Sequence, residues 1–176
     1  MHDLKSIPDN TKWQLSAQCA ARLPAMYDVV FRPVLQDKYD QLEREIWMDL
    51  AKFAFEIARS LQLPVRNAQE IAESLRTVTA ILFGPDYKGE MIEVGDDGAV
   101  IMVKHCPFLK QNAVMGAVHN GTFNRCMAFT LSAQKNLNRK YGSRFVRAMC
   151  MGDRQCEIKV EAEKGEEQKR SDKENT

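Results

Sequence analysis

The chain has 176 residues, of which 44% are hydrophobic and 28% are charged, as is typical of one globular domain and not of disordered, collagen-like or coiled-coil proteins. Lys and Arg (25) nearly balance Asp and Glu (24), and the net charge of +1 gives no reason to expect nucleic acid or an anionic membrane as a partner. No apolar run approaches the roughly 20 residues that span a bilayer, and residues 1–9 do not resemble a signal peptide, so we expect a soluble, cytoplasmic protein.

Residues 1–88 have the pattern of helices separated by prolines. Each of these prolines is expected to mark a place where a helix cannot continue: Pro8, Pro24, Pro33, Pro64 and Pro85. The clearest helix is predicted over residues 39–61, where apolar residues recur every three or four positions. This spacing predicts one buried stripe, made of Leu42, Ile46, Leu50, Phe53, Ile57 and Leu61. A further helix is predicted to begin at Asn67, whose side chain can cap it together with Glu70, and to stop at Gly84.

From residue 88 onward the pattern changes to that of strands. Two β-rich runs, residues 90–94 and 99–105, flank an Asp-Gly turn, which predicts a hairpin. Residues 122–141 predict a helix that ends at Gly142, and residues 145–151 and 156–161 predict two more strands. The last strand alternates apolar and charged residues, so one face of the sheet is expected to be buried.

The sequence therefore predicts an α/β protein of the α+β type. A single domain is expected over residues 1–161, in which a helical part (residues 1–88) packs on an antiparallel sheet with one crossing helix (residues 89–161). Nine of the last fifteen residues are charged, and the tail over residues 162–176 is expected to be disordered because it has almost nothing apolar to bury.

Five cysteines in a chain expected in the cytoplasm favour metal or thiol chemistry over disulfides, because thiols stay reduced there. Four of them belong to the predicted sheet and its helix, where their thiols can face inward: Cys106, Cys126, Cys150 and Cys156. Their spacing is not that of a zinc finger, but separate elements can bring them together around zinc or an iron-sulfur cluster. Two interpretations stay open beside this one: buried cysteines act as small apolar residues, or a single cysteine is reactive. Cys19 is predicted to be packed in the helical part.

Three further residues are candidates for a site. His105 adjoins Cys106, but neighbours on a strand point to opposite faces, so the two are not expected to act together. His119 is predicted in a loop from which it can approach a ligand. Asp153 lies in a Gly-Asp turn between two of the cysteines, and the turn alone would explain it.

The cysteine-bearing segments resemble a known family. The run Cys106-Pro107-Phe108, a cysteine on the following helix, and the closing segment over residues 149–160 with its Gly152-Asp153 turn resemble the ending of 4-vinyl-reductase-like domains. Relatives of these domains include proteins similar to L-2-amino-thiazoline-4-carboxylic acid hydrolase and the output domains of methanogen regulators. The resemblance covers about residues 84–161, and the five residues between Cys150 and Cys156 are fewer than in a typical ending of this family. It implies helices packed on an antiparallel sheet, with a pocket for a small and often hydrophobic molecule.

We therefore predict a protein that binds a small-molecule ligand or a metal cofactor, zinc or an iron-sulfur cluster, at the four cysteines. The alternative is a hydrolase of a small heterocyclic amino acid, in which Cys106 or Cys150 is a nucleophile or a metal ligand and His119 or Asp153 moves protons. A third hypothesis is a structural subunit that binds a protein partner or forms a homodimer, with every cysteine in the core.

Overall fold

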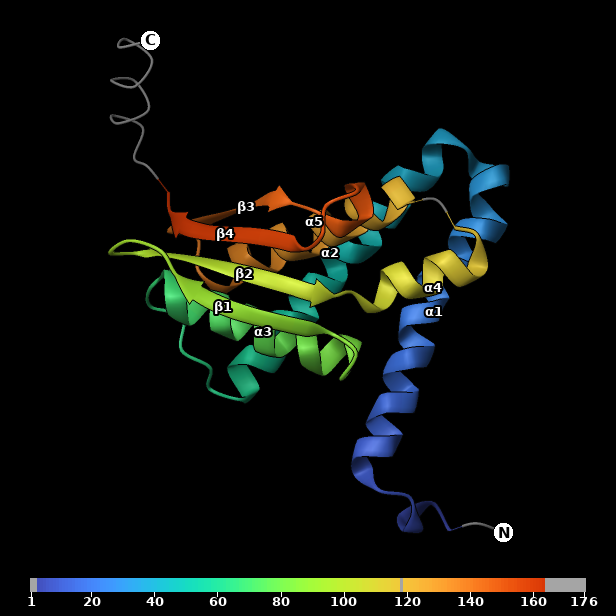
Figure 1. Cartoon of the computed structure of the whole chain (residues 1–176), viewed down its shortest axis with the longest axis horizontal. Helices are drawn as coiled ribbons and strands as arrows, with labels where there is room; N and C mark the ends of the chain where they lie inside the picture. The colour runs from blue at the N-terminus through green and yellow to red at the C-terminus, as the bar shows by residue number, and fades with distance from the viewer. Residues whose placement is uncertain (1–2, 118, 164–176) are drawn as a thin grey trace.

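The computed structural model describes residues 3–117 and 119–163 and confirms the predicted α+β fold, with helices packed against a four-stranded antiparallel sheet (Figure 1). The helical half consists of a 3-10 turn η1 (Leu4–Ser6) and helices α1 (Asp9–Leu35), α2 (Asp37–Ser60) and α3 (Ala68–Phe83). The second half consists of β1 (Lys88–Glu93), β2 (Gly98–His105), α4 (Pro107–Met115), α5 (His119–Leu137), β3 (Tyr141–Arg147), the 3-10 turn η2 (Met149–Met151) and β4 (Cys156–Ala162). Most of the tail that was predicted to be disordered, residues 164–176, lies outside the described residues.

The sheet has the strand order β1-β2-β4-β3, so the last strand of the chain lies between β2 and β3. The predicted hairpin forms between β1 and β2, and the backbone N–H of Val94 donates to the carbonyl of Gly98 at 2.9 Å. Ile101 in β2 lies between Met91 of β1 and Ile158 of β4. As the alternation predicted, Ile158 and Val160 are buried on one face of the sheet.

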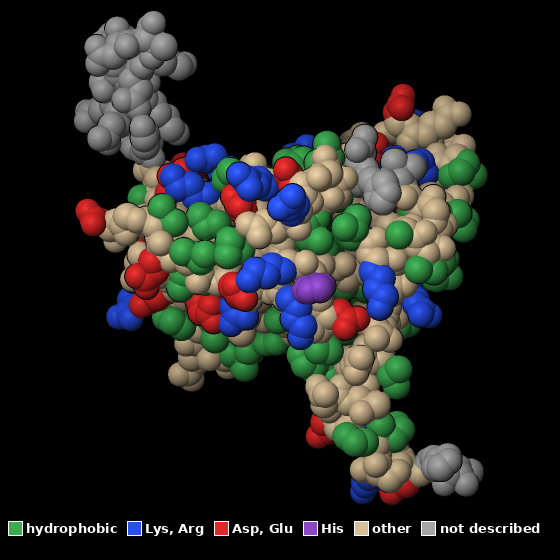
Figure 2. Space-filling model, viewed as in Figure 1, with side chains coloured by type: hydrophobic (Ala, Val, Ile, Leu, Met, Phe, Trp, Pro, Cys, Tyr) green, Lys and Arg blue, Asp and Glu red, His purple; other side chains and the backbone are tan. Residues whose placement is uncertain are grey.

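Helices α3 and α5 cover that buried face, and α2 packs mainly on α5 in a further layer (Figure 1). This arrangement confirms the prediction, since α3 belongs to the helical part and α5 is the helix of the second half that crosses the sheet. The core lies between these layers, where Ile71 and Leu75 of α3, Phe129 of α5, and Ile101 and Val160 of the sheet are at most 3% exposed. The opposite face of the sheet carries many of the charged side chains in Figure 2.

The limits of α3 follow from its end residues, as predicted. The Asn67 side chain accepts a hydrogen bond from the N–H of Glu70 at 2.8 Å, which satisfies one of the free donors of the first turn. Gly84 ends the helix with φ 87°, a conformation that favours glycine, and a Cβ at this position would clash with the side chain of Ala17 on α1.

Three helix predictions need correction. Helix α1 continues through Pro24 and Pro33, which were expected to interrupt it. A proline in a helix removes one hydrogen bond, but packing of one face against the rest of the protein can offset that loss. Helix α4 follows directly after Pro107 and was not predicted, although proline is favourable at the first position of a helix. Helix α5 ends at Leu137, so Gly142 lies within β3.

The helix predicted over residues 39–61 forms as α2, but the face predicted to be buried is wrong. Leu42, Ile46 and Phe53 are exposed by 47%, 66% and 49%. The buried face carries Trp47 and the small residues Ala51, Ala54 and Ala58 instead. Small side chains let α2 approach α5 closely, and this close approach selects the alanine face.

None of the helices within residues 3–117 and 119–163 combines the length and apolar character that a membrane span requires.

Candidate functional site

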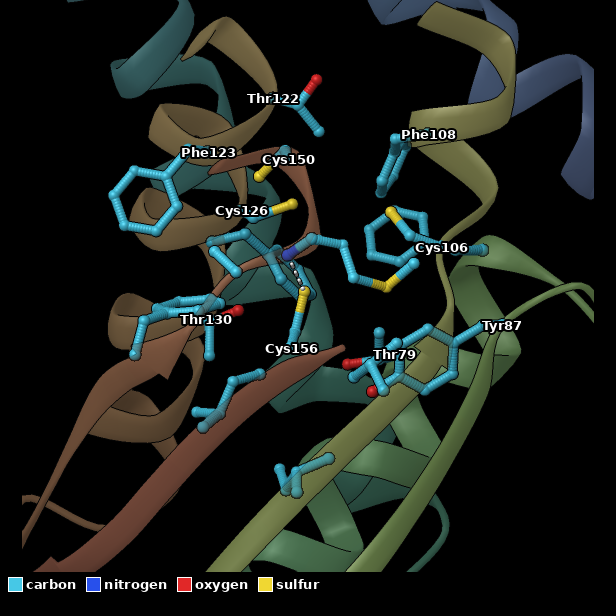
Figure 3. Close-up of a pocket in the computed structure, with 18 of the residues that line it drawn as sticks. Thr79, Tyr87, Cys106, Phe108, Thr122, Phe123, Cys126, Thr130, Cys150 and Cys156 are labelled. Atoms are coloured by element: carbon cyan, nitrogen blue, oxygen red, sulfur yellow. Dashed lines mark hydrogen bonds between the residues drawn. The ribbon is translucent and has the colours of Figure 1, made fainter. Parts of the chain in front are cut away.

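An enclosed apolar cavity lies between the sheet and the helices, at the end of the sheet where β2 stops and β4 starts (Figure 3). Side chains from α2, α3, α4, α5, the sheet and η2 form its wall. About 60 Å³ of the cavity is open to the centre of a water-sized sphere. This is less than half the roughly 150 Å³ of an engineered apolar cavity that binds benzene, so a single aromatic ring requires the side chains of the wall to move apart slightly.

Aromatic rings dominate the wall of the cavity. The seven rings that line it belong to Trp47, Phe83, Tyr87, Phe108, Phe123, Phe129 and Phe145. Phe83 contacts Phe108 edge-on with 4.7 Å between ring centroids, and Trp47 contacts Phe108 in the same way at 5.4 Å. Edge-to-face contacts of this kind stabilise the packing beyond the area that they bury, so they help to hold the rings of the wall together.

All four cysteines of the predicted site line this one cavity (Figure 3). Cys106 precedes α4, Cys126 lies on α5, Cys150 lies in η2 and Cys156 begins β4. The Sγ of Cys156 accepts a hydrogen bond from the backbone N–H of Met149 at 3.3 Å. The prediction for the fifth cysteine is wrong, because Cys19 is exposed on α1.

The environment keeps these four thiols protonated. Burial is the largest cause in each case, and it raises the pKa of Cys150 to about 11, raises the pKa values of Cys106 and Cys156, and raises that of Cys126 well above its usual value. The other thiols add to the rise, because a second thiolate nearby would repel the first. A thiol must lose its proton to act as a nucleophile, so none of the four is activated.

The structure gives no support to a four-cysteine metal centre. Within the described residues, no group of three or more His, Cys, Asp or Glu side chains is arranged to hold a metal ion. Zinc or an iron-sulfur cluster at Cys106, Cys126, Cys150 and Cys156 stays a prediction, which analysis of purified protein for iron, sulfide and zinc would test.

The residues that the hydrolase alternative requires are not assembled around a cysteine in the described part of the chain. The carboxylate of Asp153 accepts a hydrogen bond from the backbone N–H of Ala148 at 2.8 Å, so it holds the turn before β4 and does not face the cavity. His105 is exposed at the end of β2, as its position next to Cys106 predicted. The side chain of His119 lies outside the described residues.

The few polar groups on the wall were not found from the sequence. The hydroxyl of Thr79 donates to the carbonyl of Leu75 at 2.6 Å, and the hydroxyl of Thr122 accepts from the side-chain amide of Asn112. The Tyr87 ring reaches toward Thr79 in Figure 3, and its hydroxyl makes no hydrogen bond within the described residues. Burial raises the pKa of Tyr87 well above its usual value, so this hydroxyl is a neutral donor beside the cavity. In a sequence, an aromatic residue near the end of a helix or strand cannot be told apart from one that is simply packed in the core. The sequence therefore did not identify Tyr87 as a residue of the cavity.

A buried polar cluster adjoins the cavity on the side of α1 and α2. Arg125, one residue before Cys126 on α5, is fully buried, and its Nε lies 3.2 Å from Oε1 of Glu43. The same carboxylate accepts from the hydroxyl of Tyr39 at 3.2 Å. Burial raises the pKa of Glu43, and the charge of Arg125 opposes this rise. The cluster thus joins α2 to α5 directly beside the site.

Comparison with known proteins shows the fold. No protein-family model matches the sequence, and no curated protein matches it either. A crystal structure of trafficking protein particle complex subunit 3 from Naegleria fowleri, covalently bound to palmitic acid, is similar with a TM-score of 0.62 and 13% identity, over 85% of this chain and 96% of that one. The phenol-responsive sensory domain of the transcription activator PoxR, solved with phenol, is similar with a TM-score of 0.58 and 11% identity, over 81% of this chain and 74% of that one.

At these identities the likeness establishes a shared α+β fold and nothing finer. Neither structure is named as a 4-vinyl-reductase-like protein, so that resemblance stays a prediction. The class defined by the fold and the cavity is that of small α+β domains with an internal apolar pocket.

Proposed function

We propose that this protein is a binding domain for a small, uncharged, single-ring aromatic molecule, which occupies the cavity between the sheet and α5. The observation that carries this proposal is an enclosed cavity of about 60 Å³ with seven aromatic rings in its wall. Enclosed apolar cavities of modest size exclude water and bind small aromatic molecules, because the ligand regains the contacts that the empty space lacks.

The cavity favours a single ring over a long acyl chain. Its volume of about 60 Å³ is far less than the sixteen-carbon chain of palmitic acid fills. The two similar structures were each solved with a largely apolar small molecule, and phenol, the smaller of the two, is nearer to the size of this cavity. The raised pKa values of the four thiols favour reversible binding over formation of a thioester.

Tyr87 is the group that would orient the ligand. Its hydroxyl has no partner within the described residues and lies beside the cavity, so it can hydrogen-bond a ligand hydroxyl. Such a bond contributes about 0.5–1.5 kcal/mol, which corresponds to about a twofold to tenfold gain in affinity for phenol over toluene.

Isothermal titration calorimetry with phenol and toluene tests the proposal. We expect saturable binding of both, and we expect Tyr87→Phe to weaken phenol about twofold to tenfold while it leaves toluene unchanged. Ala148→Leu places extra methyl groups in the cavity and should abolish binding of both ligands. Ala133→Leu, which overpacks the core away from the cavity, is the matched control and should bind like the wild type. Absence of binding to the wild type, or equal binding to Ala148→Leu, would contradict the proposal.

A further inference from the structure

The aromatic cavity lies beside an open recess on the surface, at the end of the sheet where β2 stops. The two spaces have three wall residues in common, Cys106, Pro107 and Met149. The recess is the wider space, about 460 Å³ against about 60 Å³ for the cavity on the same measure. Its remaining wall residues come from the chain around the start of β1, the end of β2 and α4: Asp86, Lys88, His105, Leu109, Lys110 and Ala113. At the three shared residues, a wall one side chain thick separates the cavity from the recess.

Met149 is the shared residue whose side chain can move aside. Pro107 is buried in the first turn of α4, and its ring cannot rotate about the main chain. Cys106 has a short side chain with one rotatable bond between the main chain and the sulfur. Met149 is half-buried, and its unbranched side chain has three rotatable bonds and adapts easily to the space around it. Rotation of this side chain opens a passage between the recess and the cavity.

The main chain that carries Met149 is held on both sides. The N–H of Met149 donates to the Sγ of Cys156 at 3.3 Å, which is the dashed line in Figure 3. Before Met149, the N–H of Ala148 donates to the carboxylate of Asp153 at 2.8 Å. After it, the N–H of Gly152 donates to the carbonyl of Met149 at 3.1 Å. Because these bonds fix the turn η2, a change of the Met149 rotamer is the smallest movement that opens this part of the wall.

The rest of the cavity wall is harder to open. Phe108 contacts both Trp47 and Phe83 edge-on, and all three rings are at most 7% exposed. Tyr87 also borders a surface groove on its other side, but its ring packs directly on Gly89. A Cβ at Gly89 would lie only 2.9 Å from that ring, so the ring fits tightly against the main chain. A passage at either place requires packed rings to separate, which costs more than a turn of one methionine side chain.

We propose that small molecules reach the aromatic cavity from the recess, and that the side chain of Met149 is the gate through which they pass. This inference adds an entry route to the proposed binding site, and it rests on the proposed function for the identity of the ligand. In the closed arrangement Met149 completes the apolar wall of the cavity. The gate sets how fast a molecule enters and leaves, and it favours single rings over larger molecules that need a wider opening.

Quenching of tryptophan fluorescence by acrylamide measures the opening of the gate without the proposed ligand. Trp47 lines the cavity and is 6% exposed, whereas the second tryptophan of the chain, Trp13 on α1, is 38% exposed. In a Trp13→Phe background the signal therefore comes from Trp47 alone. We expect Met149→Ala to raise the rate constant of quenching about threefold or more, because the passage then stays open.

Met151→Ala is the matched control. It removes the same atoms from the same turn, but Met151 is 56% exposed and lines neither the cavity nor the recess. Its quenching should equal that of the Trp13→Phe parent, and circular dichroism should show that both alanine variants are folded. Equal increases for Met149→Ala and Met151→Ala would overturn the gate, because they would show that the whole turn had loosened.

Stopped-flow fluorescence with phenol tests the gate on the proposed ligand. Met149→Ala should raise the association rate constant about threefold or more. Met149→Ile keeps the size of the side chain but is branched at Cβ and therefore stiff, so it should lower this rate constant by about the same factor.

The two measurements separate a failure of the gate from a failure of the proposed function. If phenol does not bind but Met149→Ala alone raises the quenching of Trp47, the gate is supported and the proposed function fails. If phenol binds but the Met149 variants change neither the quenching nor the association rate, the proposed function stands and the gate is overturned.

Discussion

The ion pair between Arg125 and Glu43 gives the sharpest prediction for stability. Arg125 is fully buried, Glu43 is 6% exposed, and the Nε of the arginine lies 3.2 Å from the carboxylate. Substitution of Arg125 by Met keeps most of the apolar stem but leaves the Glu43 carboxylate buried without its counter-charge. Loss of one partner of a buried pair destabilises a protein by about 3–5 kcal/mol, and we expect a loss of that size near neutral pH.

This loss should depend on pH because the pKa of Glu43 is raised in the folded protein. A carboxyl group with a raised pKa binds its proton more tightly in the folded than in the unfolded state. Protonation of Glu43 therefore stabilises the folded state at pH values below 4.5, its pKa in the unfolded chain. This stabilisation disappears as the pH rises through the higher pKa that Glu43 has in the folded protein. Removal of Arg125 raises the folded pKa of Glu43 further, so Arg125→Met should lose less stability near pH 5 than near pH 8.

Urea unfolding followed by circular dichroism measures the free energy of unfolding at both pH values. The double variant Arg125→Met/Glu43→Gln removes the unpaired charge, so it should regain most of the lost stability and should no longer show the extra pH dependence. Equal destabilisation of Arg125→Met at the two pH values, or a double variant no more stable than the single one, would refute this reasoning. The groups around the pair, Tyr39, Asp28 and Arg32, are unchanged in all variants.

Three further predictions concern the core, the end of α3 and the thiols. Trp47→Ala should lower the free energy of unfolding by about 3–5 kcal/mol in urea melts, because it empties the centre of the aromatic cluster. Gly84→Ala should lower the free energy of unfolding by more than about 1 kcal/mol, because the new Cβ clashes with Ala17 and the residue must still adopt φ 87°. The double variant Gly84→Ala/Ala17→Gly removes the clash but not the strained backbone angle, so it should recover only part of the lost stability. Full recovery would show that the backbone angle is unimportant. With a thiol reagent at pH 8, the exposed Cys19 should react at once, whereas the buried Cys126 should react only as fast as the protein unfolds. Peptide mass spectrometry can follow the labelling of each cysteine. Rapid labelling of Cys126 would contradict its burial.

Local signals in the sequence predicted the β1–β2 hairpin, the last strand β4 and both ends of α3. The Asp-Gly turn gave the β1–β2 hairpin, and the alternation over residues 156–161 gave β4 with one buried face. Asn67 and Gly84 set the two ends of α3, because capping and positive φ depend on the few residues at a helix end. Each of these features is decided within a few residues, and a single sequence contains that information.

The convergence of the cysteines was also predictable in part. Alternation on the last strand and the helical period around Cys126 indicated inward-facing thiols, and the structure places all four on one cavity. The ligand chemistry was not predictable in the same way. Whether thiols hold a metal or line an apolar space depends on their distances and on the other groups of the wall, and seven aromatic rings from distant segments provide that wall.

Helix α2 shows most clearly what the sequence determined and what it left open. Periodicity predicted a helix over residues 39–61 and placed Leu42, Ile46 and Phe53 on one of its faces. The structure confirms the helix, and the three residues do lie along one face of it. Which face of the helix is buried was decided by tertiary packing, because α5 fits closely against the alanines and leaves the larger side chains outside. A hydrophobic period indicates that a face needs a partner, but only the packed structure decides whether that partner lies within the same chain.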